Sequence, residues 1–166
     1  AYWLIAESGG SDSAQRTLAS LMRLGAWYLA TILASARVNA ERDARRRIAL
    51  LNEILDTTDV SEAGIVNQVT ALGWTTAGWN TGLNIQLRGS VDSGRVLNFH
   101  AEMRQRLRDA GIDGPLIERT DGWSGWVSDP QEPPVDSYPT IVRGIAGALE
   151  GFVGSHSDLT AHAGVG

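Results

Sequence analysis

Three histidines, His100, His156 and His162, are the side chains best suited to bind a metal ion or to transfer a proton. They are too scattered along the chain to form a metal site by local spacing. The chain has no cysteine, so it has no thiolate ligand or nucleophile, and no Gly-x-Ser-x-Gly segment surrounds any of its serines. The glycine-rich stretch at residues 7–11 matches neither phosphate-loop pattern. The sequence therefore predicts no catalytic residue, no metal and no cofactor.

The distribution of charge bears on nucleic-acid binding. The chain has a formal net charge of −5, and all 14 of its basic residues are arginines. In the single basic cluster, Arg42 with Arg45 to Arg47, the acidic residues Glu41, Asp43 and Glu53 lie among or near the arginines. Nucleic-acid affinity needs a clustered basic surface, and a mixed-charge helix segment is usually a solvated face. We therefore expect these 166 residues to bind duplex DNA weakly at most.

The most apolar segment runs from Leu18 to Ala36 and bears on membrane insertion. Arg23, Gly25, Thr31 and Ser35 interrupt it, whereas a spanning helix needs ~20 mainly apolar residues. The chain does not begin with a basic segment followed by an apolar one, as a signal peptide would. With the lack of cysteine, these features predict a cytoplasmic protein that has no membrane partner.

A long helix is predicted from about Ala14 towards Asp56, with its cap at Ser11, Asp12 or Ser13. Apolar residues recur along its first part at alternating spacings of four and three, a coiled-coil-like seam of Leu18, Met22, Gly25, Leu29, Ile32 and Ala36. A second apolar stripe runs beside the seam, and a short strand predicted at residues 2–6 cannot cover both stripes. We expect a homodimer through this helix. The alternative is that an upstream sensor domain covers the same surface.

The remaining periodicity alternates between helix and strand. Asp59 and Glu62 form a capping box for a helix that ends at Gly73. Beyond it we predict strand 83–88, helix 96–107, a hairpin of residues 115–128, helix 141–152 and strand 159–165. This order is that of a ferredoxin-like β-α-β-β-α-β domain, so the predicted fold class is α+β. Two helices should cover one face of the sheet and leave a polar face of Asn84, Gln86, Arg88, Thr160 and His162.

Several segments resemble the CdaR-type GGDEF-like domain of PucR/CdaR bacterial transcription regulators. They are RRIALLNEILD at 46–56, the helix end Leu72-Gly73-Trp74, the strand GLNIQLRG at 82–89, the hairpin RTDGWSGWV at 119–127 and LTAHAGVG at 159–166. The resemblance covers residues 40–166 well and residues 1–39 loosely. It implies the end of a sensor domain and its exit helix at 1–40, connecting helices at 41–79 and a GGDEF-like domain at 80–166. A helix-turn-helix domain is then expected beyond Gly166.

The resemblance implies transcription control in response to small metabolites, with this region acting as a regulatory and dimerising module. DNA would be contacted only through the expected helix-turn-helix domain. No family motif places a ligand residue on this sequence, and the small-molecule effector is unknown. Two alternatives stay open: a sensor domain that itself binds a metabolite, and a degenerate cyclase relative that binds a nucleotide without turning it over.

The nearest enzymes in shape, nucleotide cyclases, hold two metal ions through carboxylates on the first strand and at the hairpin tip. The strand at residues 83–88 contains no carboxylate, and the tip reads Arg-Thr-Asp-Gly-Trp where an active cyclase has Gly-Gly-Asp/Glu-Glu-Phe. The single carboxylate of Asp121 does not hold Mg²⁺ for phosphoryl transfer, and Asp-Gly is a common hairpin turn. We therefore expect no enzymatic activity.

If a ligand or partner binds this domain, the candidate residues lie in three places. They are Arg88 and His162 on the open sheet face, Asp121 and Trp123 in the hairpin, and Gly147 and Gly151 in the last helix. Gly144 and Gly154 extend the last pair into a strip within about 80° of helix arc, where each glycine costs ~1 kcal/mol relative to alanine. Such a bare strip indicates close approach by a strand of the same sheet, or by another domain or protomer. His100 is expected to be half-buried with its polar atoms satisfied.

Overall fold

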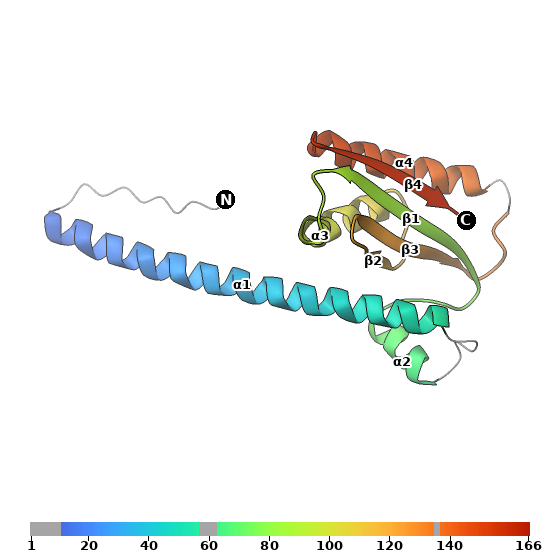
Figure 1. Cartoon of the computed structure of the whole chain (residues 1–166), viewed down its shortest axis with the longest axis horizontal. Coiled ribbons are helices and arrows are strands. Elements are labelled where there is room, and N and C mark those ends of the chain that lie inside the picture. Colours follow the sequence, from blue (N-terminus) through green and yellow to red (C-terminus); the bar gives the residue numbers. More distant parts are fainter. Residues whose placement is uncertain (1–10, 57–62, 135–136) are drawn as a thin grey trace. The chain divides into compact units, whose positions relative to one another are not determined.

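The computed structural model describes residues 11–56, 63–134 and 137–166. They form a mixed α+β structure (Figure 1), with α1 (Asp12–Asp56), α2 (Ala63–Ala71), β1 (Trp79–Gly89), α3 (Ser93–Asp109), β2 (Leu116–Glu118), β3 (Gly122–Asp129), α4 (Tyr138–Ser155) and β4 (Leu159–Val165). The chain divides into two compact units, Ala1–Arg42 and Asp43–Gly166. The predicted strand at residues 2–6 and the capping box at 59–62 lie outside the described residues.

The predicted long helix is confirmed, because α1 runs without interruption from Asp12 to Asp56. Its buried residues, Ala44, Leu50 and Leu51, all belong to the second unit. Large apolar side chains in the first unit are exposed instead: Leu21, Leu24, Trp27, Tyr28, Leu29, Ile32, Leu33 and Val38. Of the predicted seam, Leu29 and Ile32 are 46% and 45% exposed. Within the described residues, this stretch of α1 therefore presents an uncovered apolar surface.

The length and composition of α1 bear on the predicted absence of a membrane partner. An 18-residue window of this helix reaches a mean hydropathy of 1.3, and none of the window is buried. By its length and composition alone the helix could cross a membrane. A core helix of a soluble protein or a signal sequence meets the same criteria. The absence of a membrane partner therefore stays a prediction.

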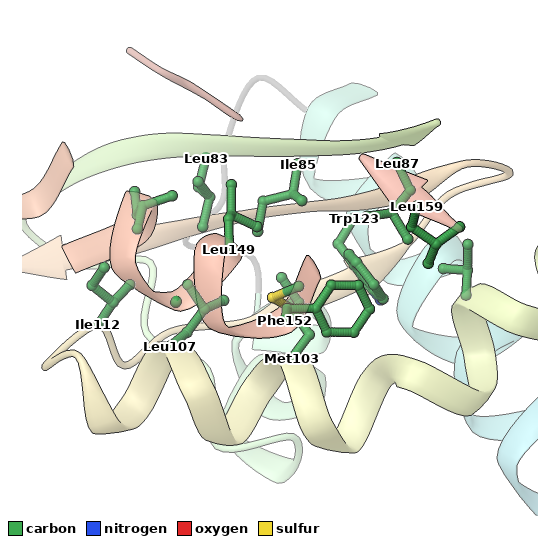
Figure 2. Packing of buried hydrophobic residues seen from close by; sticks show 14 residues of the cluster. Leu83, Ile85, Leu87, Met103, Leu107, Ile112, Trp123, Leu149, Phe152 and Leu159 are labelled. Carbon is green, nitrogen blue, oxygen red and sulfur yellow. The ribbon is translucent and has the colours of Figure 1, made fainter. Parts of the chain in front are cut away.

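The second unit is built on a four-stranded sheet in the order β2-β3-β1-β4, and each neighbouring pair of strands is antiparallel. Leu83, Ile85 and Leu87 alternate along β1 and point to one face of the sheet (Figure 2), where α3 and α4 cover them. Met103 from α3 and Phe152 from α4 are fully buried there. The predicted helix-covered face is thus present, because period-two strands and amphipathic helices each bury one side.

The opposite face of the sheet is covered at its β2–β3 side, which the sequence did not predict. Ile117 of β2 is fully buried in a second cluster with Leu50 and Leu51 of α1, Ile65 and Val69 of α2, and Trp74 from the turn after α2. Trp126 of β3 packs against the same cluster, and its ring lies edge-on to that of Trp74 at 5.5 Å. The end of α1 and the whole of α2 are therefore part of the folded sheet domain.

Two glycines have specific backbone roles. Gly73 follows α2 with φ 70°, a left-handed conformation that ends a helix, as its place in the sequence predicted. Gly122 lies opposite Gln86 where β3 begins. A Cβ atom at Gly122 would collide with the carbonyl of Ile85. The Asp-Gly pair at the hairpin therefore reflects the close approach of β1 as well as the turn.

Candidate functional site

A cyclase would hold its metal ions through carboxylates on the first strand and at the hairpin tip. Here these two segments carry other side chains and make other contacts. The side chains of Asn84, Gln86 and Arg88 are exposed along the outer face of β1. Asp121 Oδ2 accepts a hydrogen bond from Gln86 Nε2 at 2.7 Å, and its backbone oxygen accepts one from the Leu87 N–H at 2.7 Å. In the described parts of the chain, no group of three or more His, Cys, Asp or Glu side chains could hold a metal ion.

The candidate residues predicted for a ligand fall on different sides of the sheet. His162 of β4 lies opposite Gln86, Arg88 lies opposite Thr160, and all four side chains are exposed. Arg88 and His162 thus share the polar face that the sequence predicted. Because Asp121 bonds the outward-facing Gln86, its carboxylate belongs to the same face.

Trp123 lies in the core, and its assignment as a ligand or interface residue is corrected. It is fully buried, and its ring lies edge-on to Phe152 at 6.2 Å. Its indole N–H has no hydrogen-bond partner in the described structure. Because the side chain is covered on all sides, it cannot contact a ligand on the polar face.

The glycine strip of α4 does not meet a strand of the same sheet. A Cβ at Gly151 would lie 2.7 Å from Arg106 Nη1, and one at Gly144 would lie 3.1 Å from the carbonyl of Ala110. Gly147 and Gly154 have nothing within 4 Å of that position in the described structure. The expectation of a facing strand was wrong, because the close neighbours belong to α3 and to the turn after it.

A groove of about 810 Å³ runs between α4 and the edge strand β4. Val142, Ala146 and Val153 line it from α4, and Ala161 and Val165 line it from β4. Glu150 and His162 are its titratable groups. The groove is largely apolar. Its lining also includes His162, one of the predicted ligand candidates, and Gly154, the last residue of the glycine strip.

A buried charge cluster, which no pattern in the sequence predicted, joins the end of α1 to the sheet domain. Glu118 of β2 is only 5% exposed. Its Oε2 accepts a hydrogen bond from Arg47 Nε at 3.1 Å, and a second guanidinium nitrogen bonds Oε1. His100 Nδ1 of α3 lies 2.9 Å from the same Oε1, but the angles at this contact are not those of a hydrogen bond. The histidine is therefore half-buried as expected, whereas the expectation that its polar atoms are satisfied is not met at Nδ1. The carboxylate is therefore shared by α1, α3 and β2.

The partners of Glu118 determine its protonation. Burial by itself raises the pKa of this carboxyl group. The close contact with His100 and the hydrogen bonds from Arg47 outweigh burial and lower the pKa from 4.5 to about 2. The group is therefore ionised throughout the physiological range, as a structural ion pair requires. A second histidine–carboxylate pair, His156 Nε2 and Glu102 Oε2 at 3.0 Å, links α4 to α3.

Comparison with known proteins identifies no relative. The chain matches no family model, no curated protein and no solved structure. The interpretation of its function therefore depends on its own residues and their geometry.

Proposed function

We propose that this chain is the non-catalytic regulatory and dimerising part of a PucR/CdaR-type transcription regulator, which passes a signal to a DNA-binding domain outside these residues. The motifs at 46–56, 82–89 and 119–127 support the family. The order β-α-β-β-α-β with strands arranged β2-β3-β1-β4 supports a ferredoxin-like, GGDEF-like domain for residues 80–166.

One observation carries the regulatory role: the end of α1 is bonded into the sheet domain by a buried ion pair. Arg47 holds Glu118 on β2, and Leu50 and Leu51 pack with Ile117 on the far side of that strand. A packed interface shifts between discrete arrangements more readily than it deforms continuously. A shift of the end of α1 would therefore alter the packing of β2 and α3. A connecting helix suits the transmission of a signal into this domain.

The non-catalytic part of the proposal gives the first prediction. We expect no turnover of GTP or ATP with Mg²⁺ or Mn²⁺, because Asp121 is the one carboxylate at the positions that would hold two metal ions, and it is bonded to Gln86. Product formation would be measured by chromatography over long incubations, with Asp121→Ala as the matched variant. Turnover by the unmodified chain that disappears in Asp121→Ala would contradict the proposal.

The dimerising role is testable in cells. We expect the full chain, fused upstream of a DNA-binding domain that binds its operator only as a dimer, to repress a reporter at least about tenfold more than that domain alone, because tethering two modules raises their effective concentration. Ile32→Glu should abolish the gain, because it places a charge in the apolar seam of α1. Arg143→Gln, on the exposed surface of α4, should retain it. A fusion no more active than the isolated domain would refute dimerisation by this chain.

A further inference from the structure

A small polar cavity of about 190 Å³ lies beside the C-terminal half of α3. Arg104 and Arg108 of α3 line one side of it. The turn at residues 73–75 and Ser128 of β3 line the other, with Asp113 at its margin. The cavity lies within the sheet domain and is separate from the groove beside β4. No residue predicted from the sequence as a ligand candidate belongs to it.

Arg104 is the unusual member of this lining. Its side chain is half-buried, yet within the described residues it makes no hydrogen bond or ion pair. Burial lowers the pKa of this guanidinium group, the nearby charge of Arg108 lowers it further, and the charge of Asp113 offsets part of this shift. A charge that is removed from water without a partner is destabilising. Such a residue is typical of a site whose partner is supplied by a ligand.

Helix capping does not account for Arg104. The last carbonyl groups of α3 already accept hydrogen bonds from the backbone: Ala110 N–H donates to Arg106, Gly111 N–H to Arg108, and Ile112 N–H to Leu107. The five N–H donors of the Arg104 guanidinium group are therefore not needed at the helix end.

The charges around the cavity favour an anion. Its lining holds two guanidinium groups and one carboxylate, a local net charge of +1 in a chain whose net charge is −5. That carboxylate, Asp113, pairs with Arg108 at 3.2 Å, and its side chain is 77% exposed. Arg47 adds a further positive charge that acts on Arg104, although it is itself bonded to Glu118. Asp113 attracts Arg104 as well, but among the described residues its ion pair is with Arg108, so Arg104 is the guanidinium group that has no bonded partner there.

We propose that this cavity binds a small oxyanion, either a phosphate or a carboxylate group, with Arg104 as its principal ligand. The planar guanidinium fork binds two oxygens of such a group at once. The cavity is smaller than the ~300–1,000 Å³ of pockets that enclose drug-sized ligands. It therefore suits inorganic phosphate or a short carboxylic acid and not a complete nucleotide. The assignment does not depend on the regulatory role.

Thermal unfolding of the full chain tests the assignment with two probes, sodium phosphate and sodium malonate, each against sodium chloride of equal ionic strength. We expect a rise in Tm of roughly 3 °C with one or both probes at about 20 mM, because a ligand that binds only the folded state stabilises it. A response to phosphate alone would assign a phosphate site, and a response to both would assign a general oxyanion site. Equal Tm values in all three salts would overturn the proposal.

Matched variants separate this site from a general salt effect. Arg104→Gln should weaken binding of the effective probe at least about tenfold by calorimetric titration, and Arg104→Lys should weaken it less, because it keeps the charge and loses the fork. Arg143→Gln is the control, since Arg143 is exposed and, in the part of the chain that the structure describes, bonds Pro139 and Thr140 of its own helix. Circular dichroism would establish that each variant is folded. Undiminished binding by folded Arg104→Gln would overturn the assignment, whatever the reporter fusion shows.

Discussion

Glu118→Gln is expected to lower the free energy of unfolding by roughly 3 kcal/mol at neutral pH. The pKa of Glu118 falls from 4.5 to about 2 in the folded protein. A pKa difference of one unit corresponds to about 1.4 kcal/mol, and loss of one partner from a buried ion pair costs ~3–5 kcal/mol. The amide keeps the size of the side chain and removes the charge that Arg47 and His100 contact. Urea denaturation followed by tryptophan fluorescence would measure the change.

The same substitution has a defined pH dependence. Because the folded-state pKa lies below the ordinary value, the ionised carboxylate stabilises the fold fully above about pH 4.5 and loses this contribution as the pH falls towards 2. The stability difference between the unmodified chain and Glu118→Gln should therefore shrink across this range and be small near pH 2. Glu53→Gln is the control, because Glu53 is exposed on α1 and should change stability by less than about 0.5 kcal/mol. A constant difference from pH 7 to pH 2 would show that Glu118 acts by packing alone.

Leu29→Glu and Ile32→Glu are each expected to convert a dimeric chain into a monomer. Both side chains are nearly half exposed in the single chain, within a run of eight large exposed apolar residues from Leu21 to Val38. An apolar surface of this extent on one helix is typical of an interaction site, and the spacing of the seam suits a partner helix. A buried carboxylate without a partner should weaken association by at least about a hundredfold. Light scattering across a concentration series would measure the mass.

The controls for this prediction distinguish a partner helix from a membrane. Ala34→Glu places the same charge at an exposed position of α1 roughly opposite the seam, given ~100° per residue, and should leave the dimer intact. Flotation with phosphatidylcholine vesicles tests the other property of α1, its mean hydropathy of 1.3 over 18 residues. A monomeric unmodified chain, or binding to vesicles that Leu29→Glu abolishes, would contradict the helix-mediated dimer.

Local patterns in the sequence determined most of the secondary structure. The apolar residues of α1 recur with the period of a helix, and the alternation along residues 83–88 has the period of a strand. Neighbouring residues produce these signals, so no knowledge of the tertiary structure was needed. The polar outer face of β1, with Gln86 and Arg88 exposed, followed from the same alternation.

Tertiary structure decided which elements meet, and with them the sites. Arg47 and Glu118 are 71 positions apart, and their contact exists because β2 is the edge strand beside β3. Trp123 became a core residue because its register on β3 turned it towards α4. Arg104 stands out only because the folded chain half-buries it without a hydrogen-bond or ion-pair partner among the described residues. Burial and charge pairing depend on contacts between distant segments, and local periodicity carries no information about them.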